Sequence, residues 1–185
     1  VYPLEENIRL TKEAVDYAHA HGVTVEAERG HVGDGLVSGE KKEDGEYDNP
    51  DDFLTNPDEM VEFIEKTDVD CLAVAVGTSH GVYVHEPELH FDRLDKLNEL
   101  SKVPMVMHGG SGTPEDQIKE AVSKGICKLN IYSEMLSAYY TTLKEKLDTS
   151  ASMAIWVSKA NEKPLEALKQ VVKDTMDMIG STGRA

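Results

Sequence analysis

Two histidines, His80 and His108, each lie near the end of a short apolar segment and directly before a glycine. One histidine at the end of a buried strand is usually a hydrogen-bonded structural residue. Two histidines on neighbouring strands of a parallel sheet would instead lie at the same edge, where their imidazoles could bind one ion. Neutral imidazole suits Zn²⁺, Co²⁺ and related metals, and a catalytic zinc takes three protein ligands and one open position. The pattern therefore predicts a metal site that includes both histidines.

A glycine-rich turn, residues 109–112 (GGSG), follows His108 directly. Its exposed amides and the hydroxyl of Ser111 could donate to an anion, and a helix predicted after the turn would add the positive end of its dipole. A second turn between a strand and a helix, from Asn130 to Ser133, offers another helix N-terminus. The two turns together indicate a phosphate site, which resembles the one common after the last two strands of a TIM barrel.

Four short apolar segments would position these residues. They are Val23–Glu28, Cys71–Gly77, Val103–His108 and Cys127–Ile131. Each is apolar without strict alternation, which is typical of parallel strands covered on both faces. The carboxyl ends of such strands lie at one edge of the sheet, so Glu28 is expected there beside the two histidines.

Segments with helical spacing separate the four apolar segments. We predict helices at Pro3–His19, from Pro57 to about Lys66, at Phe91–Leu100, from Thr113 to Gly125, from Ser133 to about Leu147, and at Pro164–Ile179. Asn56 and Thr113 are the expected N-caps of two of them. The alternation of strands and helices predicts an α/β fold with a parallel sheet. The stretch 34–53 is rich in acidic residues and glycine, and its length indicates a mobile active-site loop.

The composition limits the classes of partner. The chain has 185 residues, 39% of them hydrophobic, and a formal net charge of −16. A nucleic-acid surface needs a basic patch, and a membrane span needs about 18–20 apolar residues, so we expect neither partner. Cys71 and Cys127 lie inside apolar segments, which predicts two buried free thiols in a reducing compartment and hence a cytoplasmic location.

Four motifs together resemble one known family. The segments VTVEAERGHVG, CLAVAVGTSHGVY, VPMVMHGGSG and CKLNIYSE, in this order and spacing, look like the C-terminal half of the class II, zinc-dependent ketose-bisphosphate aldolases. The resemblance runs from Tyr2 to about Leu147. It implies the C-terminal half of a TIM (β/α)8 barrel, with about four βα units followed by C-terminal helices. It further implies a single domain, 1–185, in which 34–53 is the active-site loop.

The resemblance also implies roles for individual residues. His80 and His108 match two of the three zinc-binding histidines, and Glu28 matches an acid associated with the metal site. The phosphate of dihydroxyacetone phosphate would be bound by Gly81, Gly109, Gly110, Ser111, Asn130, Ile131, Tyr132 and Ser133. The backbone carbonyls of Ser79, Gly81 and Gly109 match positions that hold a monovalent cation.

Some features of the family have no clear counterpart. The family's Asp-His pair, which supplies the proton-transferring aspartate and the third zinc ligand, is expected upstream of this sequence, so no catalytic residue is assigned here. The acid of the mobile loop has three candidates, Glu40, Glu43 and Asp44. Leu165 falls near a basic residue that some members use for the distal phosphate.

The implied reaction is the reversible cleavage of a ketose (bis)phosphate to dihydroxyacetone phosphate and an aldehyde, with zinc, cobalt or another divalent metal as the Lewis acid. Without the Asp-His pair the isolated chain could be inactive. A small phosphorylated sugar and further copies of the chain, as a homo-oligomer, are the expected partners. Two alternatives stay open at this point. One is a metal-free phosphosugar isomerase or epimerase, and the other is a non-catalytic truncated half-barrel.

Overall fold

The computed structural model describes residues 2–34, 53–81, 83 and 86–184. The chain divides into two compact units, Val1–Asn130 and Ile131–Ala185. The prediction that they act as a single domain stays a prediction. The predicted loop 34–53 lies outside the described residues except for its two end residues. Its three candidate acids, Glu40, Glu43 and Asp44, are therefore also outside the described residues.

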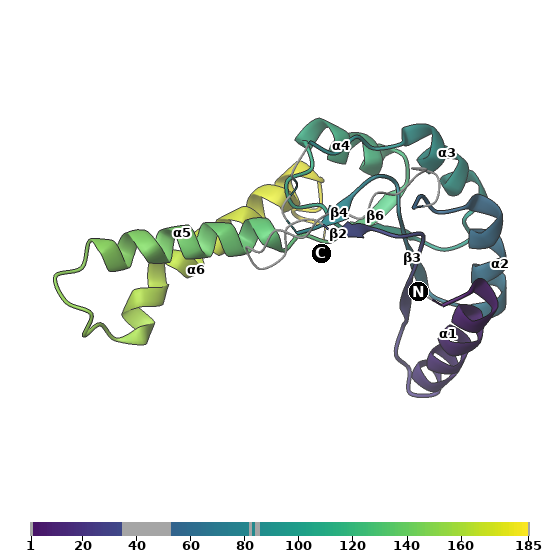
Figure 1. Cartoon of the computed structure of the whole chain (residues 1–185), viewed down its shortest axis with the longest axis horizontal. Helices are drawn as coiled ribbons and strands as arrows, with labels where there is room; N and C mark the ends of the chain where they lie inside the picture. The colour runs from purple at the N-terminus through teal and green to yellow at the C-terminus, as the bar shows by residue number, and fades with distance from the viewer. Residues whose placement is uncertain (1, 35–52, 82, 84–85, 185) are drawn as a thin grey trace. The chain divides into compact units, whose positions relative to one another are not determined.

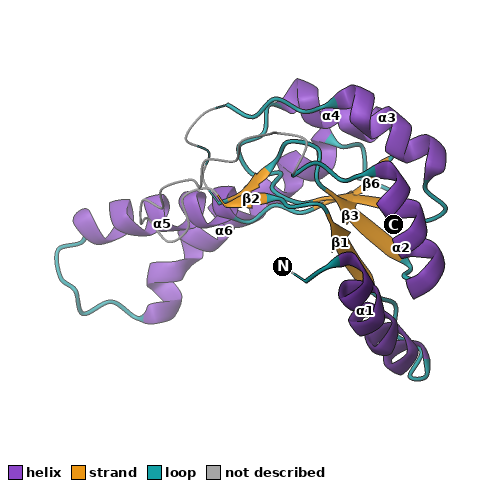
Figure 2. Cartoon of the chain, turned by 45° about the vertical axis from the view of Figure 1, so that its right-hand side comes forward, coloured by secondary structure: helices purple, strands orange, loops and turns teal. Residues whose placement is uncertain are grey.

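A four-stranded parallel sheet forms the centre of the first unit (Figures 1 and 2). Its strands are β1 (Glu26–Arg29), β3 (Cys71–Val74), β5 (Met105–Met107) and β6 (Ile126–Leu129), hydrogen-bonded in the order β1-β3-β5-β6. The predicted parallel sheet is confirmed, and the four predicted strands lie side by side in their order along the chain. The carboxyl ends of all four strands therefore lie at one edge of this sheet.

A second, two-stranded parallel sheet was not expected from the sequence. It pairs β2 (Gly33–Asp34) with β4 (Ser79–His80), so that Asp34 lies opposite His80 in the register. Two-residue strands leave no periodic pattern in a sequence, which is why this pairing escapes prediction. The pairing fixes the backbone that carries His80.

Four helices accompany the sheet: α1 (Leu4–His19), α2 (Pro57–Thr67), α3 (Phe91–Leu100) and α4 (Glu115–Ser123). Helices α2, α3 and α4 follow one another along the outside of the sheet in both Figure 1 and Figure 2. The predicted cap of α2 is confirmed, because Asn56 Oδ1 accepts from the amides of Asp58 at 2.9 Å and Glu59 at 3.3 Å. The cap predicted for α4 is wrong. Thr113 Oγ1 donates instead to the carbonyl of Gly109 at 3.2 Å, so it ties the glycine turn and not the helix.

The core of this unit lies between the two central strands and the helices. The side chains of β3 from Leu72 to Val74 and all three residues of β5 are at most 1% exposed, which agrees with strands covered on both faces. The helices contribute Met60, Phe63, Leu94 and Leu97, each 0% exposed.

The prediction of two buried thiols is wrong for Cys127. Cys71 is half-buried and Cys127 is exposed, and both are free. Cys127 lies on β6, at one end of the sheet order, where the register with β5 shifts by one residue. An apolar strand sequence does not reveal such an edge position. Among the described residues, no helix has the length and apolar character needed to cross a membrane.

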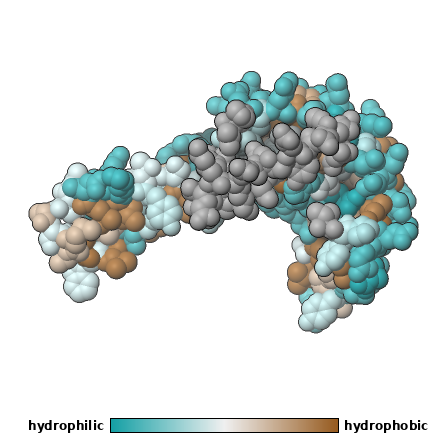
Figure 3. All heavy atoms as spheres, in the orientation of Figure 1, coloured by the Kyte–Doolittle hydropathy of each residue, from teal (hydrophilic) through white to brown (hydrophobic). Residues whose placement is uncertain are grey.

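The second unit is a pair of helices, α5 (Ser133–Asp148) and α6 (Val157–Met178). The predicted start of α6 at Pro164 is wrong, because the helix begins at Val157 and Pro164 lies inside it. The hydroxyl of Tyr139 on α5 donates to Asn161 Oδ1 at 2.7 Å, so packing against α5 supports the turns before the proline. Figure 3 shows hydrophobic surface at the end where the two helices connect. Trp156 there is 83% exposed.

Candidate active site

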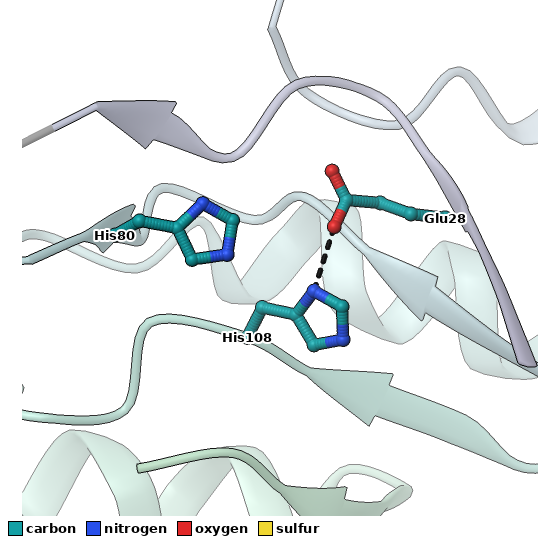
Figure 4. A group of neighbouring side chains, drawn as sticks. All are labelled: Glu28, His80 and His108. Atoms are coloured by element: carbon teal, nitrogen blue, oxygen red, sulfur yellow. Dashed lines mark hydrogen bonds and ion pairs between the residues drawn. The ribbon is translucent and has the colours of Figure 1, made fainter. Parts of the chain in front are cut away.

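Three predicted residues meet at the carboxyl ends of the strands (Figure 4). Glu28 lies in β1, His80 ends β4, and His108 follows β5 directly. Each offers one ligand atom, and these three atoms all lie within 4.8 Å of one another. The two imidazole rings have centroids 5.8 Å apart and are tilted by 44°. The structure therefore brings together all three residues predicted for the metal site.

Glu28 and His108 contact each other directly. His108 Nδ1 lies 2.6 Å from Glu28 Oε2, and the two side chains are 17% and 31% exposed for His108 and Glu28 respectively. One carboxylate oxygen and two imidazole nitrogens form a donor set that Zn²⁺ accepts, at metal–ligand distances of about 2.0–2.2 Å. The donor set thus fits a divalent metal of the zinc type.

Tyr83 is a residue of this region that the sequence argument missed. Its hydroxyl accepts from the amide of Ser79 at 3.0 Å and donates to the carbonyl of Gly109 at 2.7 Å. The same oxygen lies 3.2 Å from Thr113 Oγ1. Tyr83 therefore connects the turn that carries His80 with the turn that follows His108. A tyrosine soon after a glycine gives no sequence signal of such a connection.

Glu26 is the second missed residue. His108 Nε2 lies 3.0 Å from Glu26 Oε1, and Lys128 Nζ lies 2.9 Å from Glu26 Oε2. Burial raises the pKa of the Glu26 carboxyl, but the hydrogen bonds from His108 and Lys128 outweigh it and hold that pKa below its ordinary value. The signal was present in the sequence, because residues two apart in a strand share one face and Glu26 therefore accompanies Glu28.

The glycine turn differs in detail from the prediction. Ser111 is 7% exposed. The amide of Gly110, expected to face an anion, donates to the carbonyl of Asn130 at 3.0 Å because the ends of β5 and β6 lie side by side. The carbonyl of Gly109, expected to face a monovalent cation, accepts from Tyr83 and Thr113. These two backbone groups are already used within the protein.

The remaining predicted phosphate-binding residues lie in different parts of the chain. Gly81 belongs to the first unit, where its φ of +90° places it in the left-handed region. Ile131, Tyr132 and Ser133 belong to the second unit, in which Ser133 begins α5 as predicted. A phosphate site shared by the two turns therefore stays a prediction.

Comparison with known proteins gives a consistent result. The family model of class II fructose-bisphosphate aldolase matches residues 1–184. The uncharacterized protein YdjI of Escherichia coli K12 is 40% identical over 184 residues, which are 100% of this chain and 62% of YdjI. The chain thus spans less than two thirds of the length of this relative.

Solved structures show the same relationship. The crystal structure of the YdjI aldolase from Escherichia coli K12 matches 100% of this chain and 60% of its own, with a TM-score of 0.80 and 36% identity. A putative fructose-1,6-bisphosphate aldolase from Coccidioides immitis matches 99% of this chain and 61% of its own, with a TM-score of 0.81 and 29% identity. A fructose-bisphosphate aldolase from Campylobacter jejuni, 21% identical, matches 96% of this chain and 57% of its own with a TM-score of 0.73, which bears on the fold alone. The chain belongs to the class II fructose-bisphosphate aldolase family.

Proposed function

We propose that this chain forms the C-terminal half of the (β/α)8 barrel of a metal-dependent aldolase. The observation that carries the proposal is the cluster of Glu28, His80 and His108 at the carboxyl ends of a parallel sheet. Active sites of such barrels lie at this end of the strands. The family and the share of the relatives that the chain covers, about three fifths, also support it.

Glu28, His80 and His108 would hold the metal, with Zn²⁺ or Co²⁺ as the ions that suit one oxygen and two nitrogen ligands. A divalent cation held there would supply Lewis-acid polarisation of a substrate carbonyl. Glu28 also lies within hydrogen-bond distance of His108 and so keeps its ring directed into the cluster.

The proposed substrate is a ketose (bis)phosphate, cleaved reversibly to dihydroxyacetone phosphate and an aldehyde. A chain of net charge −16 repels a sugar phosphate, so the phosphate needs donors at short range. The glycine turn around Ser111, in the first unit, would supply such donors. The proton-transferring aspartate of the family has no counterpart in these 185 residues, and its role is left unassigned.

Metal content tests the proposal first. We expect elemental analysis of the chain, dialysed after exposure to zinc, to give about one zinc per chain. His108→Ala should lose that zinc, and His21→Ala, which removes an exposed histidine of the first unit, should keep it. The absence of stoichiometric zinc would favour the metal-free isomerase. Because the proton-transferring aspartate has no counterpart in these residues, the substrate is tested by binding: dihydroxyacetone phosphate should bind the zinc-loaded chain, and a chelator should abolish that binding.

A further inference from the structure

The ring of His108 lies between two carboxylates. Its Nδ1 is 2.6 Å from Glu28 Oε2, and its Nε2 is 3.0 Å from Glu26 Oε1. Ionised carboxylates only accept hydrogen bonds, so each ring nitrogen that bonds one of them must carry a proton. A neutral imidazole has one N–H, and the choice of the nitrogen that carries it decides which nitrogen is left to bind a metal.

The two contacts have different surroundings. Nδ1 faces Glu28 and the ring of His80, and so points into the cluster (Figure 4). Nε2 faces Glu26, which is not part of that cluster. A proton kept on Nε2 by Glu26 would leave the lone pair of Nδ1 free for a cation. Metal-bound histidines commonly donate their second N–H to a carboxylate in this way.

Glu26 is itself held in place from across the sheet. Its Oε2 accepts from Lys128 Nζ at 2.9 Å, and Lys128 comes from β6 whereas Glu26 comes from β1. The same ammonium lies 2.8 Å from Asn130 Oδ1. One oxygen of Glu26 is thus used by Lys128, and the other oxygen is directed at His108. The series continues to Asn130, a residue of the predicted phosphate-binding segment.

We propose that Glu26 is a positioning residue for His108: it fixes the ring proton on Nε2 and presents Nδ1 to the metal, and Lys128 holds Glu26 in the orientation that does so. The inference rests on the metal site of the proposed function. It assigns a role to two residues outside the three metal ligands.

Cobalt binding tests the inference without any assay of activity. Co²⁺ is titrated into the metal-free chain and followed by its visible absorption and by competition with a chelator. We expect Glu26→Ala to bind about 10- to 100-fold more weakly than the wild type, the usual cost of losing such an outer contact. Glu26→Gln should recover most of the affinity, because its amide oxygen still accepts from Nε2. Equal weakening by both variants would mean that only the charge of Glu26 matters, and would overturn the proposal.

A variant of Lys128 separates positioning from simple electrostatics, because the two predict opposite changes in cobalt affinity. Removing a cation near a metal site should tighten metal binding if the effect is purely electrostatic. Positioning predicts that Lys128→Met weakens cobalt binding, because Glu26 loses its anchor. Lys124→Met removes the same charge from an ion pair between the C-cap of α4 and Asp95 of α3, and should leave cobalt binding unchanged. Tighter binding by Lys128→Met would overturn the role given to Lys128.

The ring nitrogens of His108 can also be observed directly. Proton–nitrogen correlation spectra of the chain labelled at its seven histidines report which nitrogen carries the proton, and His108→Gln identifies the signals. We expect a proton on Nε2 in the wild type and its loss or redistribution in Glu26→Ala. Lack of cobalt binding by the wild type would defeat the metal site, but these spectra would still decide the role of Glu26. A proton on Nδ1 alone would overturn it.

Discussion

Gly109 lies against the backbone of Ser79. A Cβ at Gly109 would be 2.4 Å from the carbonyl oxygen of Ser79, closer than any ordinary contact. Ser79 precedes His80 and Gly109 follows His108, so this contact brings together the two chain segments that carry the histidines. The distance between the two imidazoles therefore depends on the absence of a side chain at position 109.

We expect Gly109→Ala to destabilise the protein and to weaken cobalt binding. Alanine at a φ of +70° costs about 1–2 kcal/mol in backbone strain, and the clash with Ser79 adds to it by pushing the two turns apart. Gly22→Ala is the matched control, because Gly22 has the same φ of +70° and no atom within 4 Å of the added Cβ. Urea unfolding and cobalt titration of both variants separate strain from displacement. Unchanged cobalt affinity in Gly109→Ala would contradict this account.

Tyr83→Phe removes the hydroxyl that joins the same two turns. We expect a loss of stability of about 1–3 kcal/mol, because the amide of Ser79 and the carbonyl of Gly109 lose a partner. Cobalt binding should weaken as well, since the hydroxyl then no longer joins the two turns. Tyr139→Phe also loses one hydroxyl hydrogen bond, to Asn161, and should leave cobalt binding at the wild-type level. The comparison is made by urea unfolding and by cobalt titration.

The elements of the fold that follow from local pattern could be predicted from the sequence. The helix Phe91–Leu100 has the predicted bounds, because the spacing of Leu94 and Leu97 puts both in the core. The apolar start of the first predicted strand is not part of the sheet. Val23 is 56% exposed, and β1 begins only at Glu26, where pairing with Cys71 starts. Pairing between distant segments, which no local window contains, decides such boundaries.

The candidate site was predictable to the extent that it depends on strand ends. The order of the parallel strands suffices to place Glu28 and His108 at one edge, whereas the backbone of His80 is fixed by the pairing of β2 with β4, which was not predicted. The contacts around them were not predictable. Tyr83 contacts Gly109, 26 residues away, and Glu26 contacts His108, 82 residues away, and no spacing rule relates such pairs. The spacing of Glu26 and Glu28 indicated only that the two share one face of β1. The use of the Gly110 amide by Asn130 likewise follows from the register of two strands.

Thr55 holds together the ends of β1 and β3, next to the candidate site. Its side chain is 0% exposed, donates to the carbonyl of Arg29 and accepts from the amide of Ala75 at 2.8 Å. Thr55→Val keeps the shape and removes the hydroxyl, so two backbone groups lose their partner. We expect a loss of at least about 1–3 kcal/mol in the free energy of unfolding.

The control for Thr55 is a serine at the same position. Thr55→Ser keeps the hydroxyl and loses one methyl group, which should cost about 0.8 kcal/mol. Urea unfolding of the two variants distinguishes the hydrogen bonds from the packing. A larger loss in Thr55→Ser than in Thr55→Val would show that the methyl group matters more than the hydroxyl.

Asp70 joins the end of α1 to the segment before β1. Its Oδ2 lies 2.9 Å from His19 Nε2 and accepts from the amide of Val25 at 2.6 Å. The hydrogen bond from His19 is the largest cause that lowers the pKa of the Asp70 carboxyl, and the hydrogen bond from the Val25 amide is the second. Together they hold this pKa below its ordinary value. The folded state therefore favours the ionised form more than the unfolded chain does.

This difference in pKa predicts how the contribution of Asp70 to stability depends on pH. A carboxyl whose pKa is lower in the folded state stabilises the protein fully above its unfolded pKa of about 3.9, and this contribution is lost as the pH falls through the folded value. We expect Asp70→Asn to unfold at a lower urea concentration than the wild type near neutral pH. The two midpoints should converge as the pH is lowered from about 5.5 to about 2.5.

Asp16→Asn, which removes one carboxylate of an exposed ion pair with Lys12 on α1, should change the midpoint little at any pH in this range. A gap between Asp70→Asn and the wild type that stays constant down to the lowest pH would mean that the charge of Asp70 contributes nothing, and that only the shape of its side chain matters.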